Sequence, residues 1–170
     1  METQNRNGRP LPVLTQTENN TTLWVGHFHN DPDDHFAGQT FTCPSGGMLD
    51  NIQVYSSAVH HAGELQLTLH EFNNTSKDWG PSLGSSTFEI DKRDHAKWIR
   101  FGLPPVDLKQ GTTYGFRINS ANDAMVGLGE AATGTRRPFT FGHEWNGDSR
   151  NVIGNFFSYF SLAFKVELSA

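Results

Sequence analysis

The sequence has little of three features that would fix its class at once. It has a single cysteine, Cys43, so no internal disulfide can form. It has no run of about 18 apolar residues, the length that a membrane-spanning helix needs. The first residues, METQNRNGRP, lack the hydrophobic core of a secretory signal. We therefore expect no membrane span, and no signal peptide in the chain as it stands.

Basic charge is also scarce. Lys and Arg number 13 against 18 Asp and Glu, which gives a formal net charge of −5. Affinity for a phosphate backbone depends mainly on clustered Lys and Arg. We therefore expect no nucleic-acid partner.

What the sequence does contain is typical of short strands joined by many turns. Of its 170 residues 17 are Gly, while hydrophobic residues make up 35% and charged residues 18%. Asn and Thr are abundant as well. A chain of this length is enough for one core of ordinary size. We predict an all-β protein with one domain.

The domain is predicted to begin after an N-terminal arm. Residues 1–21 are polar, contain two prolines and show no hydrophobic period, which indicates an extended arm outside the domain. Polar termini gain order only where something holds them. We expect the arm to pack on its own domain or on a neighbouring subunit, and the single domain to span residues 22–170.

Alternating apolar and polar residues predict three strands most clearly. In the segment 63–72 the side chains of Leu65, Leu67 and Leu69 share one face. Segments 112–119 and 161–168 repeat the same pattern with aromatic and aliphatic residues. Each is typical of a strand with one buried face.

Seven weaker candidates bring the expected number of strands to about ten. They lie at 23–29, 35–42, 49–56, 85–90, 97–103, 124–130 and 138–145. Turn signals separate them, for example Pro44-Ser45-Gly46-Gly47, Trp79-Gly80-Pro81 and Asn146-Gly147-Asp148. The spacing predicts a two-sheet antiparallel β-sandwich, with a jelly-roll as the favoured topology.

The order of these signals resembles a known group of modules. It runs AGQTFTCPSGGMLDNIQVYSS, GELQLTLHEF, KWIRFGLPPVDLKQGTTYGFRI and FSLAFKVEL, over about residues 36–168. This is similar to bacterial jelly-roll modules of the choice-of-anchor type and to related carbohydrate-binding-like sandwiches. The resemblance implies a jelly-roll fold and, less specifically, an accessory binding role on a cell surface.

Two tryptophans, Trp79 and Trp145, fall at predicted turns. An aromatic ring at a turn either stacks on a sugar or a partner protein, or covers the end of the sandwich. Polar residues lie close to both in the sequence. The expected ligand-binding set is therefore Trp79 and Trp145 with Asp78, Asn146, Asp148 and Arg150.

The segment GHFHNDPDDH concentrates acids and histidines. Asp31, Asp33 and Asp34 offer hard oxygen ligands, so a structural calcium ion is one interpretation. A transition metal at His27 and His29 is a second, and a solvated acidic turn is the third. We expect no other cofactor.

The sequence carries no catalytic motif that we recognise. Glu130 and Glu144, which end neighbouring predicted strands, are the best carboxylate pair for hydrolysis of a glycosidic bond. No nucleophile elbow, phosphate-binding loop or zinc-protease motif is present. We expect a protein that is not an enzyme.

Two functions remain open at this point. The first is a binding module that recognises glycan on a cell or particle surface. The second is a structural or decoration protein of a larger assembly such as a phage virion, with the N-terminal arm making contacts between subunits. The expected partners are glycan or neighbouring subunits in a homo-oligomer, and the expected location is the extracellular surface or a virion.

Overall fold

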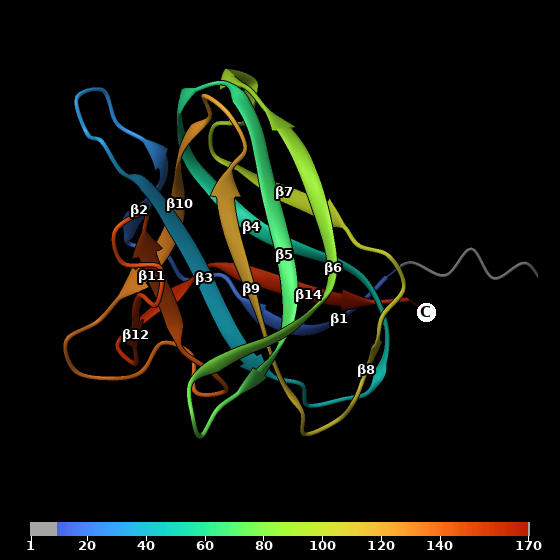
Figure 1. Cartoon of the computed structure of the whole chain (residues 1–170). Helices are drawn as coiled ribbons and strands as arrows, with labels where there is room; N and C mark the ends of the chain where they lie inside the picture. Colours follow the sequence, from blue (N-terminus) through green and yellow to red (C-terminus); the bar gives the residue numbers. More distant parts are fainter. Residues whose placement is uncertain (1–9, 170) are drawn as a thin grey trace, which may run out of the picture.

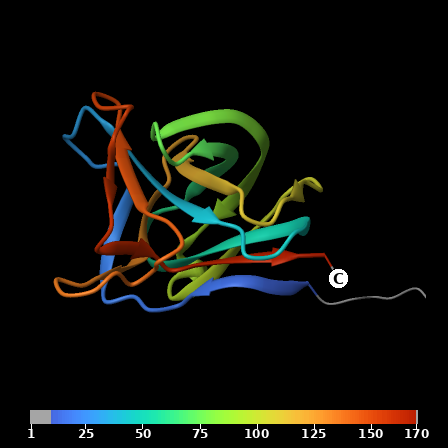
Figure 2. The same ribbon diagram turned by 90° about the horizontal axis from the view of Figure 1, so that it is seen from below.

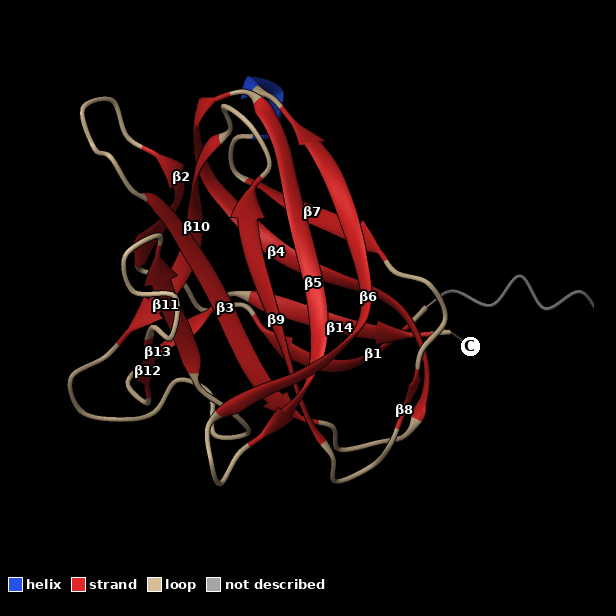
Figure 3. Cartoon of the chain, viewed as in Figure 1, coloured by secondary structure: helices blue, strands red, loops and turns tan. Residues whose placement is uncertain are grey.

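The computed structural model describes residues 10–169, and these residues form an all-β fold. Nearly every element is a strand, and the only helix within the described residues is the short 3-10 turn η1 (Figure 3). The elements in chain order are β1 (Leu11–Gln16), β2 (Thr21–His27), β3 (Asp34–Thr42), β4 (Gly47–His61), β5 (Gly63–Asn73), β6 (Asp78–Ile90), η1 (Lys92–Asp94), β7 (Lys97–Gly102), β8 (Asp107–Leu108), β9 (Thr113–Ser120), β10 (Met125–Ala132), β11 (Glu144–Asp148), β12 (Asn155–Phe157), β13 (Phe160–Leu162) and β14 (Phe164–Leu168). The all-β prediction is confirmed, with fourteen strands where about ten were expected.

The three segments predicted from alternation form strands with the expected buried faces, and segment 161–168 is divided between β13 and β14. In β5, the side chains of Leu65, Leu67 and Leu69 are buried while Gln66 and Thr68 are only partly covered. β9 and β14 alternate in the same way. Period-two patterning with one buried face predicted these elements because burial of the apolar face is what stabilises them.

The strands belong to one curled antiparallel network. Its main path runs β1-β14-β4-β10-β2-β3-β9-β5-β6, and the shorter strands attach to β3, β4, β10 and β11. β2 pairs with β10 along most of its length and with β3 at two positions, Gly26↔His35 and His27↔Asp34. The expected division into two separate sheets is therefore not what the hydrogen bonding shows, because β2 joins both halves.

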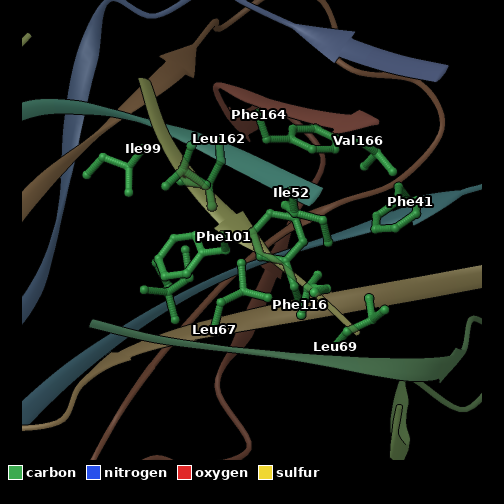
Figure 4. Close-up of a cluster of buried hydrophobic side chains, with 14 of the residues drawn as sticks. Phe41, Ile52, Leu67, Leu69, Ile99, Phe101, Phe116, Leu162, Phe164 and Val166 are labelled. Atoms are coloured by element: carbon green, nitrogen blue, oxygen red, sulfur yellow. The ribbon is translucent and has the colours of Figure 1, made fainter. Parts of the chain in front are cut away.

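The curl brings the two halves of this sheet face to face. β3, β9, β5 and β6 lie side by side, and β4, β7, β14 and β1 cross behind them (Figure 1), and the view from below shows the curl of the sheet (Figure 2). Phe116 of β9 and Phe164 of β14 meet across this space with ring centres 5.8 Å apart. Figure 4 shows this core, to which both halves contribute aromatic and aliphatic side chains.

Part of the predicted arm lies inside the fold. Residues 11–16 form β1, which pairs with β14, and Leu14 is buried in the core. The prediction of an arm outside the domain is wrong for this segment, since its short apolar stretch LPVL completes the edge beside β14. Residues 1–9, the rest of the predicted arm, lie outside the described residues.

Two predicted turns are strands. The segment Trp79-Gly80-Pro81 lies within β6, at the end of the main strand path, where an edge strand tolerates a proline that donates no ladder hydrogen bond. The segment Asn146-Gly147-Asp148 lies in β11 and pairs with β3. Long-range pairing overrides the local turn preference at both places.

No helix in the described part of the chain has the length and apolar character needed to cross a membrane.

Candidate functional site

A row of side chains crosses the outer surface of the sheet, on the side away from the core. Trp145 of β11 lies opposite Gly38 of β3, Gly38 opposite Arg117 of β9, and Arg117 opposite Thr68 of β5. The next positions of β9 and β5, Phe116 and Leu69, point into the core. Strand alternation therefore places these polar and aromatic side chains together on one surface.

Two glycines make room for large rings on this surface. A Cβ at Gly38 would meet the Phe116 carbonyl oxygen at 2.7 Å and the Trp145 ring at 3.0 Å. A Cβ at Gly115 would come within 2.6 Å of the Trp79 ring. Both tryptophans can therefore lie close against the backbone of the sheet.

The two tryptophans are in contact with each other. Their ring centres are 5.5 Å apart in an edge-to-face arrangement, and Trp79 also packs on Phe72 at 5.0 Å and Phe156 at 6.3 Å. Trp145 is only 1% exposed, and its indole N–H donates to the Ile153 carbonyl at 2.9 Å. Trp145 is thus a buried support rather than the exposed turn residue that the sequence suggested.

Arg117 lies over this aromatic pair. The guanidinium carbon is 4.6 Å from the centre of the Trp79 ring and 5.8 Å from that of Trp145. A cation over an indole face is attracted by the ring quadrupole, by roughly 0.5–2 kcal/mol depending on burial. Burial lowers the pKa of Arg117, which nevertheless keeps its charge because an arginine starts so high.

His70 holds the guanidinium from the side. Its Nδ1 lies 3.0 Å from the Gly80 carbonyl oxygen, so this nitrogen carries the hydrogen and donates. Nε2 of the neutral ring then accepts from Arg117 at 3.1 Å. Burial, followed by the charge of Arg117, lowers the pKa of His70 and keeps this ring neutral.

The Arg117 side chain lines a pocket of about 320 Å³, here named the Arg117 pocket. Its other lining residues are Phe36, Thr68, His70, Ile118, Asn119, Trp145 and Val152. Among residues 10–169, no carboxylate forms an ion pair with Arg117. The volume is at the small end of the range for pockets that hold small ligands, roughly 300–1,000 Å³.

The other predicted ligand-binding residues do not line the Arg117 pocket. Asp78 lines a second pocket beside Glu71. Asn146 and Asp148 line a third pocket, which shares the lining residue Phe36 with the Arg117 pocket. Arg150 pairs with Asp33 at 2.8 Å on the exposed surface. Of the predicted set, Trp79 and Trp145 come together beneath Arg117, whereas Asn146 and Asp148 line the third pocket.

Each carboxylate of the acidic segment has a different side-chain partner. Asp31 contacts His35 at 2.7 Å, Asp34 contacts His27 at 3.2 Å, and Asp33 pairs with Arg150. The hydrogen bond from His35, before all other causes, lowers the pKa of Asp31. Within residues 10–169, no three His, Cys, Asp or Glu side chains group so as to hold a metal ion. The three carboxylates predicted to bind calcium therefore do not converge on one point.

Glu130 and Glu144 lie inside the fold. Glu144 is 1% exposed and Glu130 is 7% exposed, and neither lines any of the three pockets described above. Burial, and then the hydrogen bond and charge of Glu130, raise the pKa of Glu144 to about 10. At neutral pH the pair therefore retains a proton.

Sequence reasoning missed Arg117, His70, Asn119 and Thr68 as site residues. A signal was present, since all four stand on the polar positions of strands whose apolar positions were recognised. No local pattern in the sequence indicates that β5 and β9 are neighbours, and this pairing is what brings Thr68 opposite Arg117. Without that pairing, the four residues read only as solvent-facing.

Comparison of the chain with protein-family models and with curated protein sequences found no match.

Proposed function

We propose that this protein is a non-catalytic binding module that recognises a glycan in the Arg117 pocket. One observation carries the proposal. The Arg117 guanidinium, held against Trp79 and Trp145, lines a small pocket, and none of the described residues supplies a carboxylate partner for it. A fixed polar group of this kind suits recognition, because little conformational entropy is lost when a ligand binds.

The composition of the pocket suits a sugar ring. Phe36 and Val152 offer apolar surface, while Thr68, Asn119 and Arg117 offer hydroxyl, amide and guanidinium groups. A sugar presents C–H faces that pack on apolar side chains and hydroxyls that need hydrogen-bond partners. Pockets with mostly apolar walls and a few oriented polar groups are the usual form of small-molecule sites.

The chain's resemblance to jelly-roll modules of carbohydrate-binding-like proteins points the same way. Such a module would act on the extracellular surface or on a virion, which is where glycan is displayed. Hydrolysis of a glycoside needs two carboxylates flanking the bond, and the residues that line this pocket include none. The pocket therefore favours binding over turnover.

A glycan array followed by titration calorimetry would test the proposal. We expect at least one glycan to bind, and we expect Asn119→Ala to weaken that binding about five- to twentyfold through loss of a hydrogen bond. The control is Asn74→Ala, which removes an exposed amide from the loop between β5 and β6. Absence of binding to any glycan on the array would reject the proposal.

A second candidate function is assembly with neighbouring subunits, as in a decoration protein. It is favoured by two adjacent apolar side chains, Val152 and Ile153, which are 64% and 80% exposed beside the Arg117 pocket. Exposed apolar residues are frequent at protein interfaces when they are contiguous. Light scattering after size exclusion would show an oligomer that Ile153→Asp dissociates, whereas a monomer at all concentrations would exclude this function.

A further inference from the structure

We infer that the glycan recognised in the Arg117 pocket is acidic, and that the carboxylate of a sugar acid pairs with the Arg117 guanidinium. This inference rests on the proposed function and assigns a chemical class to its ligand. It is carried by the charge, the hydrogen bonding and the burial of Arg117.

The local charge of the pocket favours an anion. Of the described residues that line the pocket, Arg117 alone is charged, since His70 is held neutral by its contacts. The chain as a whole is acidic, with a formal net charge of −5. A single positive group inside an otherwise neutral pocket attracts an anion to that pocket, although the net charge of the protein is negative.

The Arg117 guanidinium has unused hydrogen-bonding capacity. Arginine has five N–H donors. Within residues 10–169, the one hydrogen bond that the Arg117 guanidinium makes to protein goes to His70. The remaining donors are available to the pocket, in a planar fork whose position is set by Trp79, Trp145 and His70.

Among the described arginines that carry a side-chain contact, Arg117 differs in being partly buried without a counter-ion. A charge taken partly out of water is unfavourable unless a counter-charge or polar groups replace the lost hydration. The arginines at Arg93, Arg100, Arg136 and Arg150 each pair with a carboxylate of the protein. Arg117 is more buried than these and pairs with none among the described residues, so a ligand anion would supply what the fold leaves out.

The planar fork favours a carboxylate over other anions. Two parallel N–H donors match the two oxygens of a carboxylate, which makes the pair bidentate and directional. Thr68 and Asn119, on the neighbouring walls, can then serve the ring hydroxyls. A sulfate or phosphate group would meet the same charge, so the test must separate these anions from a carboxylate.

The decisive test changes the ligand and leaves the protein intact. A panel of uronic-acid and sialic-acid oligosaccharides is titrated calorimetrically beside the methyl ester of each, beside neutral oligosaccharides, and beside sulfated ones. We expect the acid to bind about 10- to 100-fold more tightly than its ester, the range for a charge-assisted pair. We also expect the affinity for the acid to fall as salt is raised.

Variants of the protein provide the second measurement. Arg117→Lys retains the charge but loses the planar fork, and Arg117→Gln loses both. For the acid, we expect Arg117→Gln to weaken binding more than Arg117→Lys does. For the ester, we expect little change in affinity from either variant. Arg93→Gln is the matched control, because it removes an equally charged arginine whose side chain is 81% exposed and pairs with Asp91. Thermal melts show which variants remain folded.

The outcomes separate the inference from the proposed function. Equal affinity for acid and ester, or preference for a neutral glycan, rejects the acidic ligand while the glycan-binding function stands. Preference for sulfated sugars rejects the carboxylate. Absence of binding to the whole panel, in the folded wild-type protein, rejects both.

Discussion

Two neighbouring residues of β11 belong to regions that accommodate a buried ionisable group in opposite ways. Glu144 points into the core, where it is 1% exposed and shares a proton with Glu130. Trp145 points outward and supports the guanidinium of Arg117. The two regions lie on the two faces of the same sheet.

The difference between these regions follows from acid–base chemistry. A carboxyl group can lose its charge by keeping a proton, so a buried acid pair needs no counter-ion at neutral pH. An arginine keeps its charge at any physiological pH. The charge of Arg117 must therefore be stabilised by the groups around it, which are the faces of two indoles and a neutral imidazole. One side of the guanidinium remains open to solvent. The acid pair has a structural character, whereas the arginine has the character of a binding site.

We expect the largest effect on stability from the removal of Trp145, which supports Arg117. Trp145→Ala deletes a large, almost fully buried ring and its hydrogen bond to Ile153. We expect the free energy of unfolding to fall by about 3–5 kcal/mol, as for other aromatic-to-alanine changes in a core. Chemical denaturation measures this loss.

The matched control for that variant is Trp98→Ala. Trp98 is a half-buried tryptophan of β7 whose ring carries Lys165 at 4.2 Å. We expect a smaller loss, about 1–2 kcal/mol, because part of the ring is solvated already. Equal losses for the two variants would contradict the role of Trp145 as a buried support.

The second effect concerns the acid pair. The pKa of Glu144 is about 10 in the folded protein, well above the value near 4.3 of an unfolded glutamate, so the folded state binds more protons between these limits. Stability is therefore greatest below about pH 4 as far as this group is concerned, and decreases as the pH rises toward 10. Glu144→Gln needs no proton, and we expect it to stabilise the protein by about 1–3 kcal/mol at pH 8.

Denaturation at a series of pH values would measure this gain, which should vanish at pH 4. Glu71→Gln, which changes an exposed glutamate of β5, is the control and should leave the curve within about 0.5 kcal/mol of wild type. If Glu144→Gln destabilises the protein at pH 8, the pair holds its charge by an interaction that the structure does not contain among residues 10–169.

A smaller effect is expected from the imidazole that holds Arg117. The pKa of His70 is lowered in the folded state by burial, so its contribution to stability is present above the unfolded value near 6.5 and is lost as the pH falls below it. Protonation would also place two cations side by side. We expect His70→Gln to flatten the loss of stability below pH 6.5 by about 1 kcal/mol.

The difference between the wild-type and His70→Gln curves isolates this residue, because His143, whose pKa is lowered by burial and then by Lys77 and Arg137, is present in both proteins. Parallel curves from pH 7 to pH 4 would show that His70 does not change its protonation on folding. In that case the imidazole would not be the acceptor for Arg117.

The smallest effect on stability is expected at Arg117 itself. Arg117→Met retains the long apolar stem while removing the charge. The lost attraction to the two indoles is offset by the removal of a partly desolvated cation, so we expect a change of less than about 1 kcal/mol. Ligand binding should nevertheless be lost. A loss of stability above 3 kcal/mol would make Arg117 a structural residue and would weaken the contrast with the acid pair.

The fold was predictable from the sequence where burial imposes alternation. β5, β9 and β14 each bury one face, and their apolar residues recur at every second position. β1 and β11 were not predicted correctly. A short strand such as β1 carries too few residues to show a period, and β11 contains Asn-Gly-Asp, a sequence that prefers a turn until β3 pairs with it.

The candidate site was predictable only in part. Trp79 and Trp145 were recognised as unusual, but the sequence assigned both to turns and left open whether each ring binds a ligand or covers the end of the sandwich. The decisive residue, Arg117, looked like any outward-facing arginine on a half-buried strand. Its significance depends on Gly38 and Gly115, whose missing side chains let the tryptophans lie beneath it.

The sequence by itself therefore determined the all-β class, the apolar faces of the main strands, and the absence of a basic field or an internal disulfide, because each of these depends on composition or on local periodicity. The tertiary structure alone decided that β2 joins both halves into one sheet, that Glu144 faces inward beside Glu130, and that Arg117 lies on two tryptophans. Those features arise from pairing between strands far apart in the chain, and one sequence does not encode such pairing in any local pattern.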